Sequence, residues 1–185
     1  YGDSGLNPEA KILDCRGLDR FMAFDARLGL LRAESGVSLG EILHLIVPHG
    51  WFVPVTPGTL SVTLAGAIAN DVHGKNHHRQ GSFGRHVRRI GLVRSDLGDL
   101  ELSPEEHPDL FLATLGGLGL TGLITWAEIS LLPIVSSHMR QETLAFGNLA
   151  EFFRLNAESE ARFEHVAAWV DCTASKSNLG RGVLF

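Results

Sequence analysis

The sequence lacks most of the features that would assign it at once to a disulfide-rich or membrane-spanning class. It has only 2 cysteines among 185 residues, Cys15 and Cys172, and they form no C-x-x-C pair. Two such distant cysteines do not indicate a disulfide framework, and they are consistent with a reducing compartment. No apolar run is as long as a membrane span, because four glycines interrupt the stretch 115–124. We therefore expect no transmembrane segment.

The sequence also lacks two motifs that would indicate a hydrolase or a zinc site. No G-x-S-x-G sequence occurs, so the nucleophile elbow of an α/β-hydrolase is not indicated. Of the 9 histidines, four lie between positions 73 and 86, yet their spacing fits no zinc pattern and only Asp71 lies near them. We therefore expect no metal site.

The most informative stretch, residues 57–86, begins with small and hydroxyl-bearing residues. It reads PGTLSVTLAGAIANDVHGKNHHRQGSFGRH. Gly58, Ala65 and Gly66 have little side-chain bulk, so the backbone there can approach a flat or charged ligand closely. Hydroxyl groups and backbone N–H groups in the same run could hold a phosphate. A tight turn followed by a closely packed helix would use the same residues, so this half alone leaves both interpretations open.

The second half of this stretch is strongly basic. Residues 72–95 contain no Asp or Glu but carry one lysine, five arginines and four histidines, although the whole chain has a net charge of −5. Positive charge beside a small-residue run is typical of a site for an anionic ligand. A solvated basic loop and a nucleic-acid-binding module are the alternatives. The second is disfavoured because Phe83 is the only aromatic residue of the segment.

Local patterns predict a mixture of helices and strands. Ser38-x-x-Glu41 is a capping box before an apolar stripe, which predicts a helix up to Ile46. The small-residue run 62–69 predicts a second helix. Ser103 followed by Pro104 predicts the start of a third helix, which can continue to Leu115. The expected strands lie at 12–14, 28–33, 87–94, 100–102 and 123–131, with a turn at 21–27.

After Pro133 the pattern changes, and we expect a domain boundary near residues 134–138. His138–Phe146 suits a strand, Asn148-x-x-Glu151 suits a helix start, and 164–171 suits a strand around Trp169. This α+β succession predicts the beginning of another domain. The expected domains are therefore 1–136 and 137–185.

The order of these motifs resembles a known family. The sequence P-G-T-x-x-V-T-x-x-G-A-I-A-x-D-x-H-G-K-N-H-H-x-x-G-S-F-G is similar to that of FAD-linked oxidoreductases with a vanillyl-alcohol-oxidase-type (PCMH-type) FAD domain. Among these, it resembles in particular the decaprenylphosphoryl-ribose oxidase-like enzymes. Tyr1-Gly2-Asp3 resembles the end of the family's pyrophosphate loop, and 113–124 resembles a second glycine-rich sequence that passes under the flavin.

The resemblance implies an α+β fold and FAD as the cofactor. It places Tyr1-Gly2-Asp3 at the pyrophosphate and Asn70–His73 near the flavin ring, while Ile124 would contribute backbone contacts. Ala65 stands where the family often has glycine. The implied cofactor-binding residues are Tyr1, Gly2, Asp3, Gly58, Thr63, Leu64, Ala65, Gly66, Asn70, Asp71, Val72, His73 and Ile124.

The resemblance also implies an activity and a set of roles. The expected reaction transfers hydride from an alcohol carbon of a sugar, polyol or sugar-lactone-like substrate to the flavin, and the substrate could be phosphate- or lipid-linked. His73 is the expected catalytic residue, which would orient a substrate hydroxyl or stabilise negative charge near the reduced flavin. Lys75 and Trp169 are expected at the substrate. A surface lysine and a core tryptophan are the alternatives for these two.

Compared with the family pattern, the chain is expected to be incomplete at both ends. We expect the chain alone to be inactive, empty of FAD and prone to self-association through uncovered apolar surface. The full-length protein is expected to be cytoplasmic, with membrane association left open, and to bind no nucleic acid. The alternative function is a non-catalytic phosphate- or nucleic-acid-binding module that uses 72–95. A third possible class is a cofactor-free scaffold with the same fold.

Overall fold

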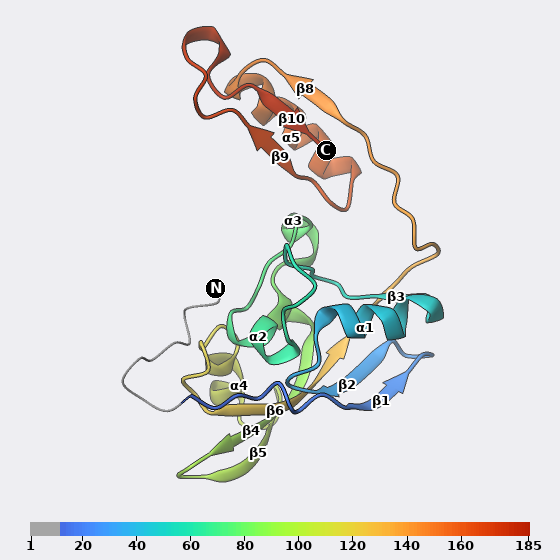
Figure 1. The fold of residues 1–185 in the computed structure, drawn as a ribbon, viewed down its shortest axis with the longest axis vertical. Coiled ribbons are helices and arrows are strands. Elements are labelled where there is room, and N and C mark those ends of the chain that lie inside the picture. The colour runs from blue at the N-terminus through green and yellow to red at the C-terminus, as the bar shows by residue number, and fades with distance from the viewer. Residues whose placement is uncertain (1–11) are drawn as a thin grey trace. The chain divides into compact units, whose positions relative to one another are not determined.

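The structure, a computed structural model, describes residues 12–185, so the Tyr1-Gly2-Asp3 tripeptide lies outside the described residues. The chain forms two compact units, which Figure 1 shows as ribbons. The first unit comprises the residues up to Gly74 and Gln80–Val135, and the second comprises Lys75–Arg79 and Ser136–Phe185. The chain therefore enters the second unit briefly at Lys75 and returns at Gln80, which the sequence pattern did not predict.

The first unit is built on a five-stranded antiparallel sheet in the order β1-β2-β6-β4-β5. Leu31 pairs with Ile129 across β2 and β6, and Ile90 pairs with Ala127 across β4 and β6. All four side chains are 0% exposed, so the centre of the sheet forms part of the core. The strands are β1 (Phe21–Asp25), β2 (Leu30–Glu34), β4 (Val87–Arg94), β5 (Gly98–Leu102) and β6 (Leu123–Ser130).

Helices α1 (Leu39–Ile46) and α2 (Leu64–Ala69) lie on one side of this sheet (Figure 1). Each begins at a hydroxyl cap, since Ser38 accepts the Glu41 N–H at 3.2 Å and Thr63 accepts the Gly66 N–H at 3.2 Å. The capping-box prediction for α1 is confirmed, because the Glu41 carboxylate also accepts the Ser38 N–H. The smaller elements are η1 (Val47–His49), β3 (Trp51–Phe52), η2 (Phe83–His86), α4 (Pro108–Thr114) and β7 (Leu132–Pro133).

Two local predictions are wrong. Residues 12–14 form no strand, and strand β1 lies instead where a turn was expected. The turn is shorter than predicted because the Asp25 carboxylate accepts the N–H groups of Arg27 and Leu28, both at 2.9 Å, and so closes a β1–β2 hairpin. Ser103 does not begin a helix. Its hydroxyl accepts the N–H groups of two following residues in a turn, and α4 begins only at Pro108.

The second unit is a three-stranded antiparallel sheet with one long helix. The strand order is β8-β10-β9, and α5 packs against β8 and β10. Asn148 caps α5 by accepting the Glu151 N–H at 3.0 Å, as its sequence position predicts. The elements are α3 (His77–Gln80), which spans the return to the first unit, β8 (Leu144–Phe146), α5 (Leu149–Arg162), β9 (Ala168–Val170), η3 (Lys176–Asn178) and β10 (Gly182–Leu184).

The mixture of helices with antiparallel sheets confirms the predicted α+β class. Within residues 12–185, no helix is both long enough and apolar enough to cross a membrane.

Candidate cofactor site and active site

The small-residue run forms the turn before α2 and the first turn of that helix. The Leu64 N–H donates to Val37 O at 2.8 Å, and the Ala65 N–H donates to Ser35 O at 3.0 Å. Together with the Gly66 N–H, which Thr63 accepts, all three groups already donate within the protein. These three N–H groups are therefore already engaged within the protein, and the small side chains allow close packing of α2 on β6. Their contact with a cofactor surface stays a prediction. Phosphate binding by the remaining N–H and hydroxyl groups of the run also stays a prediction.

The surface before α2 nevertheless has room and polar groups for a flat, charged cofactor. A Cβ atom at Gly58 would meet no heavy atom within 4 Å, so this turn is open. The exposed hydroxyl groups of Thr59 and Ser61 lie 2.9 Å apart, and one proton of the pair can still be donated to an outside acceptor such as a phosphate oxygen. Ala65 and Gly66 are partly exposed. These residues fit the expected FAD.

The other end of α2 is held by the second glycine-rich stretch, 115–122. The Gly116 N–H donates to Ile68 O at 2.9 Å, and the Leu118 N–H donates to Ala69 O at 2.8 Å. Gly116 and Leu118 have φ angles of 74° and 53°, the left-handed conformation that turns such a loop back on a helix end. The structure therefore brings together the two glycine-rich stretches that the resemblance places around the flavin.

Asp71 and Val72 fix the start of the loop that carries His73. Asp71 has a φ of 42°, and its carboxylate accepts the Gly84 N–H at 2.7 Å. Val72 is 1% exposed, and its carbonyl accepts the Phe83 N–H at 2.9 Å. His73 follows directly; its main chain forms a bridge with Ser82, and its side chain is exposed. The main chain at His73 is thus held in place while the ring remains at the surface, where it can meet a substrate.

The next residues of the H-G-K-N-H-H motif bind the end of α5 in the second unit. The Val166 N–H donates to Lys75 O at 2.9 Å. The Arg79 guanidinium donates to Glu160 O at 3.2 Å and to Ala161 O at 3.0 Å, two carbonyls in the last turn of α5. Arg79 therefore caps this helix end, and these guanidinium donors are not available to an anionic ligand. Asn76 and His78 add contacts to Glu164 Oε1 at 3.3 Å and Phe163 O at 3.2 Å.

Other arginines of the basic segment 72–95 also have partners inside the protein. Arg89 pairs with Glu101, and Arg94 pairs with Asp96. The Arg88 guanidinium donates to Ser130 Oγ at 2.5 Å. The charges of Arg89 and Arg94 are therefore compensated within the protein, so part of the positive charge of the segment is not available to a ligand. Three cations of the segment, Lys75, Arg85 and Arg88, form no ion pair with any of residues 12–185.

The clustered histidines do not converge on one point. His78 contacts Phe163 O, whereas His86 Nε2 lies 2.9 Å from Gln80 O. Burial lowers the pKa of His86, so its ring favours the neutral form; the bond to Gln80 O acts in the opposite direction. Among residues 12–185, no group of three or more His, Cys, Asp or Glu side chains is arranged to hold a metal ion.

Two remaining predicted residues lie apart from the α2 region. Ile124 is 5% exposed within β6, so only its backbone could meet a cofactor. Trp169 is 66% exposed on β9, so the alternative of a core tryptophan is wrong. Sequence reasoning missed the packing role of Gly84, which the G-S-F-G motif could have suggested, and the capping role of Arg79, which it could not. The partner Glu160 O is 81 positions away from Arg79.

Comparison with known proteins is consistent with this geometry. A family described as FAD binding domain matches residues 2–101, more than half of the chain. The chain therefore belongs to the FAD binding domain family, of the PCMH type, and the cofactor of this flavoprotein family is FAD.

Several curated relatives share this similarity. The chain is 38% identical to decaprenylphosphoryl-beta-D-ribose oxidase of Mycolicibacterium smegmatis over 186 aligned positions, which cover 100% of the chain and 40% of that protein. It is 29% identical to human Delta(24)-sterol reductase, over 59% of the chain and 21% of that protein. It is 31% identical to cytokinin dehydrogenase 6 of Oryza sativa, over 70% of the chain and 26% of that protein. The chain thus spans at most 40% of the length of these relatives.

Proposed function

We propose that this protein is an FAD-dependent oxidoreductase that removes hydride from an alcohol carbon of a sugar, polyol or sugar-lactone-like substrate. The observation that carries the proposal is the placement of His73. His73 is exposed directly after the buried Val72, on a loop of an FAD-binding domain whose first N–H groups, at Asp71 and Val72, donate to carbonyls of α2. The similarity to a ribose oxidase over the whole chain supports a sugar-type substrate.

FAD, when bound, supplies the hydride acceptor of such a reaction. His73 would orient the substrate hydroxyl and, as a neutral imidazole, take its proton at a ring nitrogen. Lys75, exposed and without an ion pair among the described residues, would hold a phosphate or a hydroxyl-rich part of the substrate. Trp169, exposed on its strand, would offer an aromatic face to a sugar ring.

The proposed compartment is the cytoplasm. Cys15 and Cys172 are both free thiols, and Cys172 is exposed, which is typical of proteins in a reducing environment.

The proposal is tested on the purified full-length protein, by its visible spectrum and by rapid-mixing kinetics. Addition of a sugar, polyol or lactone substrate should bleach the bound flavin. His73→Ala should slow this bleaching by about 10²–10⁴-fold, because a positioned acid–base group is lost, with FAD affinity nearly unchanged. His138→Ala is the matched control, since His138 is also exposed but lies outside the loop. Equal bleaching rates in the two variants would contradict the role of His73, and a protein that binds no flavin would contradict the function.

A further inference from the structure

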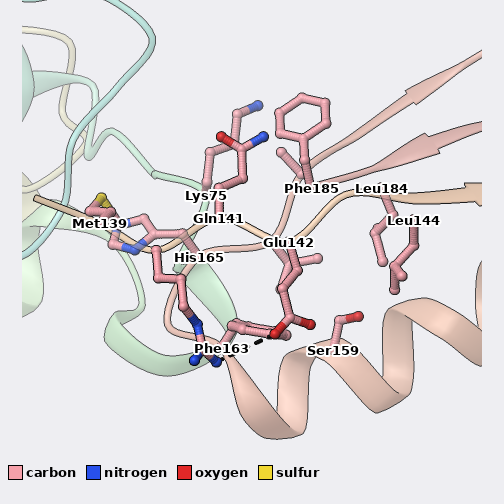
Figure 2. Close-up of a pocket in the computed structure, with 13 residues that line it drawn as sticks. Lys75, Met139, Gln141, Glu142, Leu144, Ser159, Phe163, His165, Leu184 and Phe185 are labelled. Atoms are coloured by element: carbon pink, nitrogen blue, oxygen red, sulfur yellow. Dashed lines mark hydrogen bonds and ion pairs between the residues drawn. The ribbon is translucent and has the colours of Figure 1, made fainter.

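The second unit contains a cavity of about 240 Å³ that the proposed reaction does not explain (Figure 2). Its wall includes Leu144 and Leu184 from the sheet, Ser159 from α5, and Phe163 just after that helix. An apolar cavity of about 150 Å³ holds a molecule the size of benzene, and pockets for drug-sized ligands begin near about 300 Å³. The size therefore suits a short aliphatic chain rather than a complete sugar–lipid conjugate.

Two polar side chains of the cavity wall have unused bonding capacity. Lys75 lines the cavity, and its ammonium group forms no ion pair or hydrogen bond with residues 12–185. His165 also lines it, and its Nδ1 is buried without a partner among the same residues. Burial lowers the pKa of His165, so the ring is neutral near pH 7. A buried ring nitrogen without a partner is unfavourable, and a ligand could satisfy it.

The charge balance of the wall favours an anion. Glu142 is the only acidic side chain that lines the cavity in the described part of the chain, and its charge is compensated. Its carboxylate lies 3.3 Å from the Arg140 guanidinium and 3.4 Å from that of Arg162. The dashed line in Figure 2 marks the first of these contacts. Because two arginines share the single Glu142 charge and Lys75 has no ion pair, the groups around the cavity carry excess positive charge.

We infer that this cavity binds a short amphiphile with an aliphatic chain and one anionic oxyacid head, either a carboxylate or a phosphate monoester. The chain lies among the apolar side chains, and the head binds the Lys75 ammonium group. His165 Nδ1 is satisfied either by donating its proton to an oxygen of the head or by accepting from the O–H of a phosphate head or an ordered water. Every residue that lines the cavity belongs to the second unit. Because Lys75 is also the residue proposed above to hold the substrate, the inference rests on the proposed function in this respect, and its test measures binding without flavin reduction so that the two can fail separately.

Isothermal titration calorimetry of the purified protein tests the site with four probes. Octanoate and n-octyl phosphate, each below its micelle concentration, should bind with one-to-one stoichiometry. Inorganic phosphate and 1-octanol should each bind at least about tenfold more weakly, since one lacks the chain and the other lacks the charge. A comparison of the affinities of octanoate and n-octyl phosphate shows whether the site prefers a carboxylate head or a phosphate head. Equal binding of 1-octanol and the anions, or no binding of either anion, would overturn the inference.

Two variants locate the site. Lys75→Met should weaken binding of the preferred anion by about threefold to tenfold, whereas Lys176→Met, at an exposed lysine of the same unit, should leave it unchanged. Ser159→Leu should fill the cavity from α5 and abolish the preference for the octyl chain, with folding checked by circular dichroism. Equal affinities for the two lysine variants would show that the anion binds elsewhere and would overturn the inference, even if Ser159→Leu failed to fold.

Discussion

The Asp71 carboxylate accepts the Gly84 N–H at 2.7 Å and so joins the two ends of the loop that carries His73. A Cβ atom at Gly84 would lie 2.9 Å from that same Asp71 oxygen and 3.2 Å from the side chain of Leu115. A side chain at position 84 would therefore displace the Asp71 carboxylate, so this hydrogen bond requires glycine at that position. This contact also connects the loop to the second glycine-rich stretch, because Leu115 stands at its beginning.

Gly84→Ala should destabilise the first unit. The added methyl group must displace either the Asp71 carboxylate or Leu115, and overpacking of this kind costs about 1–3 kcal/mol. Urea unfolding followed by circular dichroism measures the loss. Gly17→Ala is the control, because a Cβ there would meet nothing within 4 Å. Equal stability of the two variants would show that the loop can move aside without cost.

Thr63→Ala should weaken α2 at its N-terminus. The Thr63 hydroxyl accepts the Gly66 N–H, and loss of such a cap costs about 1 kcal/mol. Thr63→Ser retains the oxygen and should restore most of the stability. Thermal unfolding of the three proteins checks this order, and a serine variant as unstable as the alanine variant would show that the threonine methyl group matters instead.

Arg79→Ala should loosen the last turn of α5. The carbonyls of Glu160 and Ala161 lose their donor, and a favourable charge at the helix C-terminus is worth about 0.3–1 kcal/mol. Hydrogen exchange should be faster at the Phe163 N–H, which closes this turn on Ser159 O. Arg154→Ala, whose side chain on α5 pairs only with Glu151 and Glu158 of the same helix, should leave that exchange rate unchanged.

Acid should destabilise the second unit through Asp171. Hydrogen bonds from Thr173, and then Arg181, lower the pKa of Asp171 from 3.8 to about 2. A carboxylate whose pKa is lower in the folded state than in the unfolded state stabilises the fold above the unfolded value. This stability is lost as the pH falls from about 4 towards 2. Asp171→Asn should flatten the dependence of the unfolding free energy on pH in this window, and an unchanged slope would contradict the assignment.

Local chemistry explains which parts of the fold could be predicted. The Ser38 capping box, the Asn148 cap and the strand predicted at 87–94 each depend on residues a few positions apart, and the structure confirms all three. The position of β1 could not be predicted from apolar content alone. Its hairpin depends on the Asp25 carboxylate, which shortens the turn, and on pairing with β2.

The candidate site was predicted only in part, for a similar reason. The motif located His73 and the two glycine-rich stretches, and the structure ties both stretches to α2. Composition alone could not show that the N–H groups of Leu64 and Ala65 already have acceptors, because Val37 and Ser35 lie far away in the sequence. Nor could it show that Arg79 is used by α5. Charge in a sequence does not reveal which charges remain available after folding.

The passage of Lys75–Arg79 into the second unit has a consequence for how such proteins can be divided or recombined. The two units are interleaved along the chain, so no single cut separates them. A fragment that starts at Ser136 would leave the last carbonyls of α5 and the Val166 N–H without their partners. An exchange of this unit between related proteins would have to carry the H-G-K-N-H-H loop with it. The loop that presents His73 and the unit that contains Trp169 would therefore have to be transferred together.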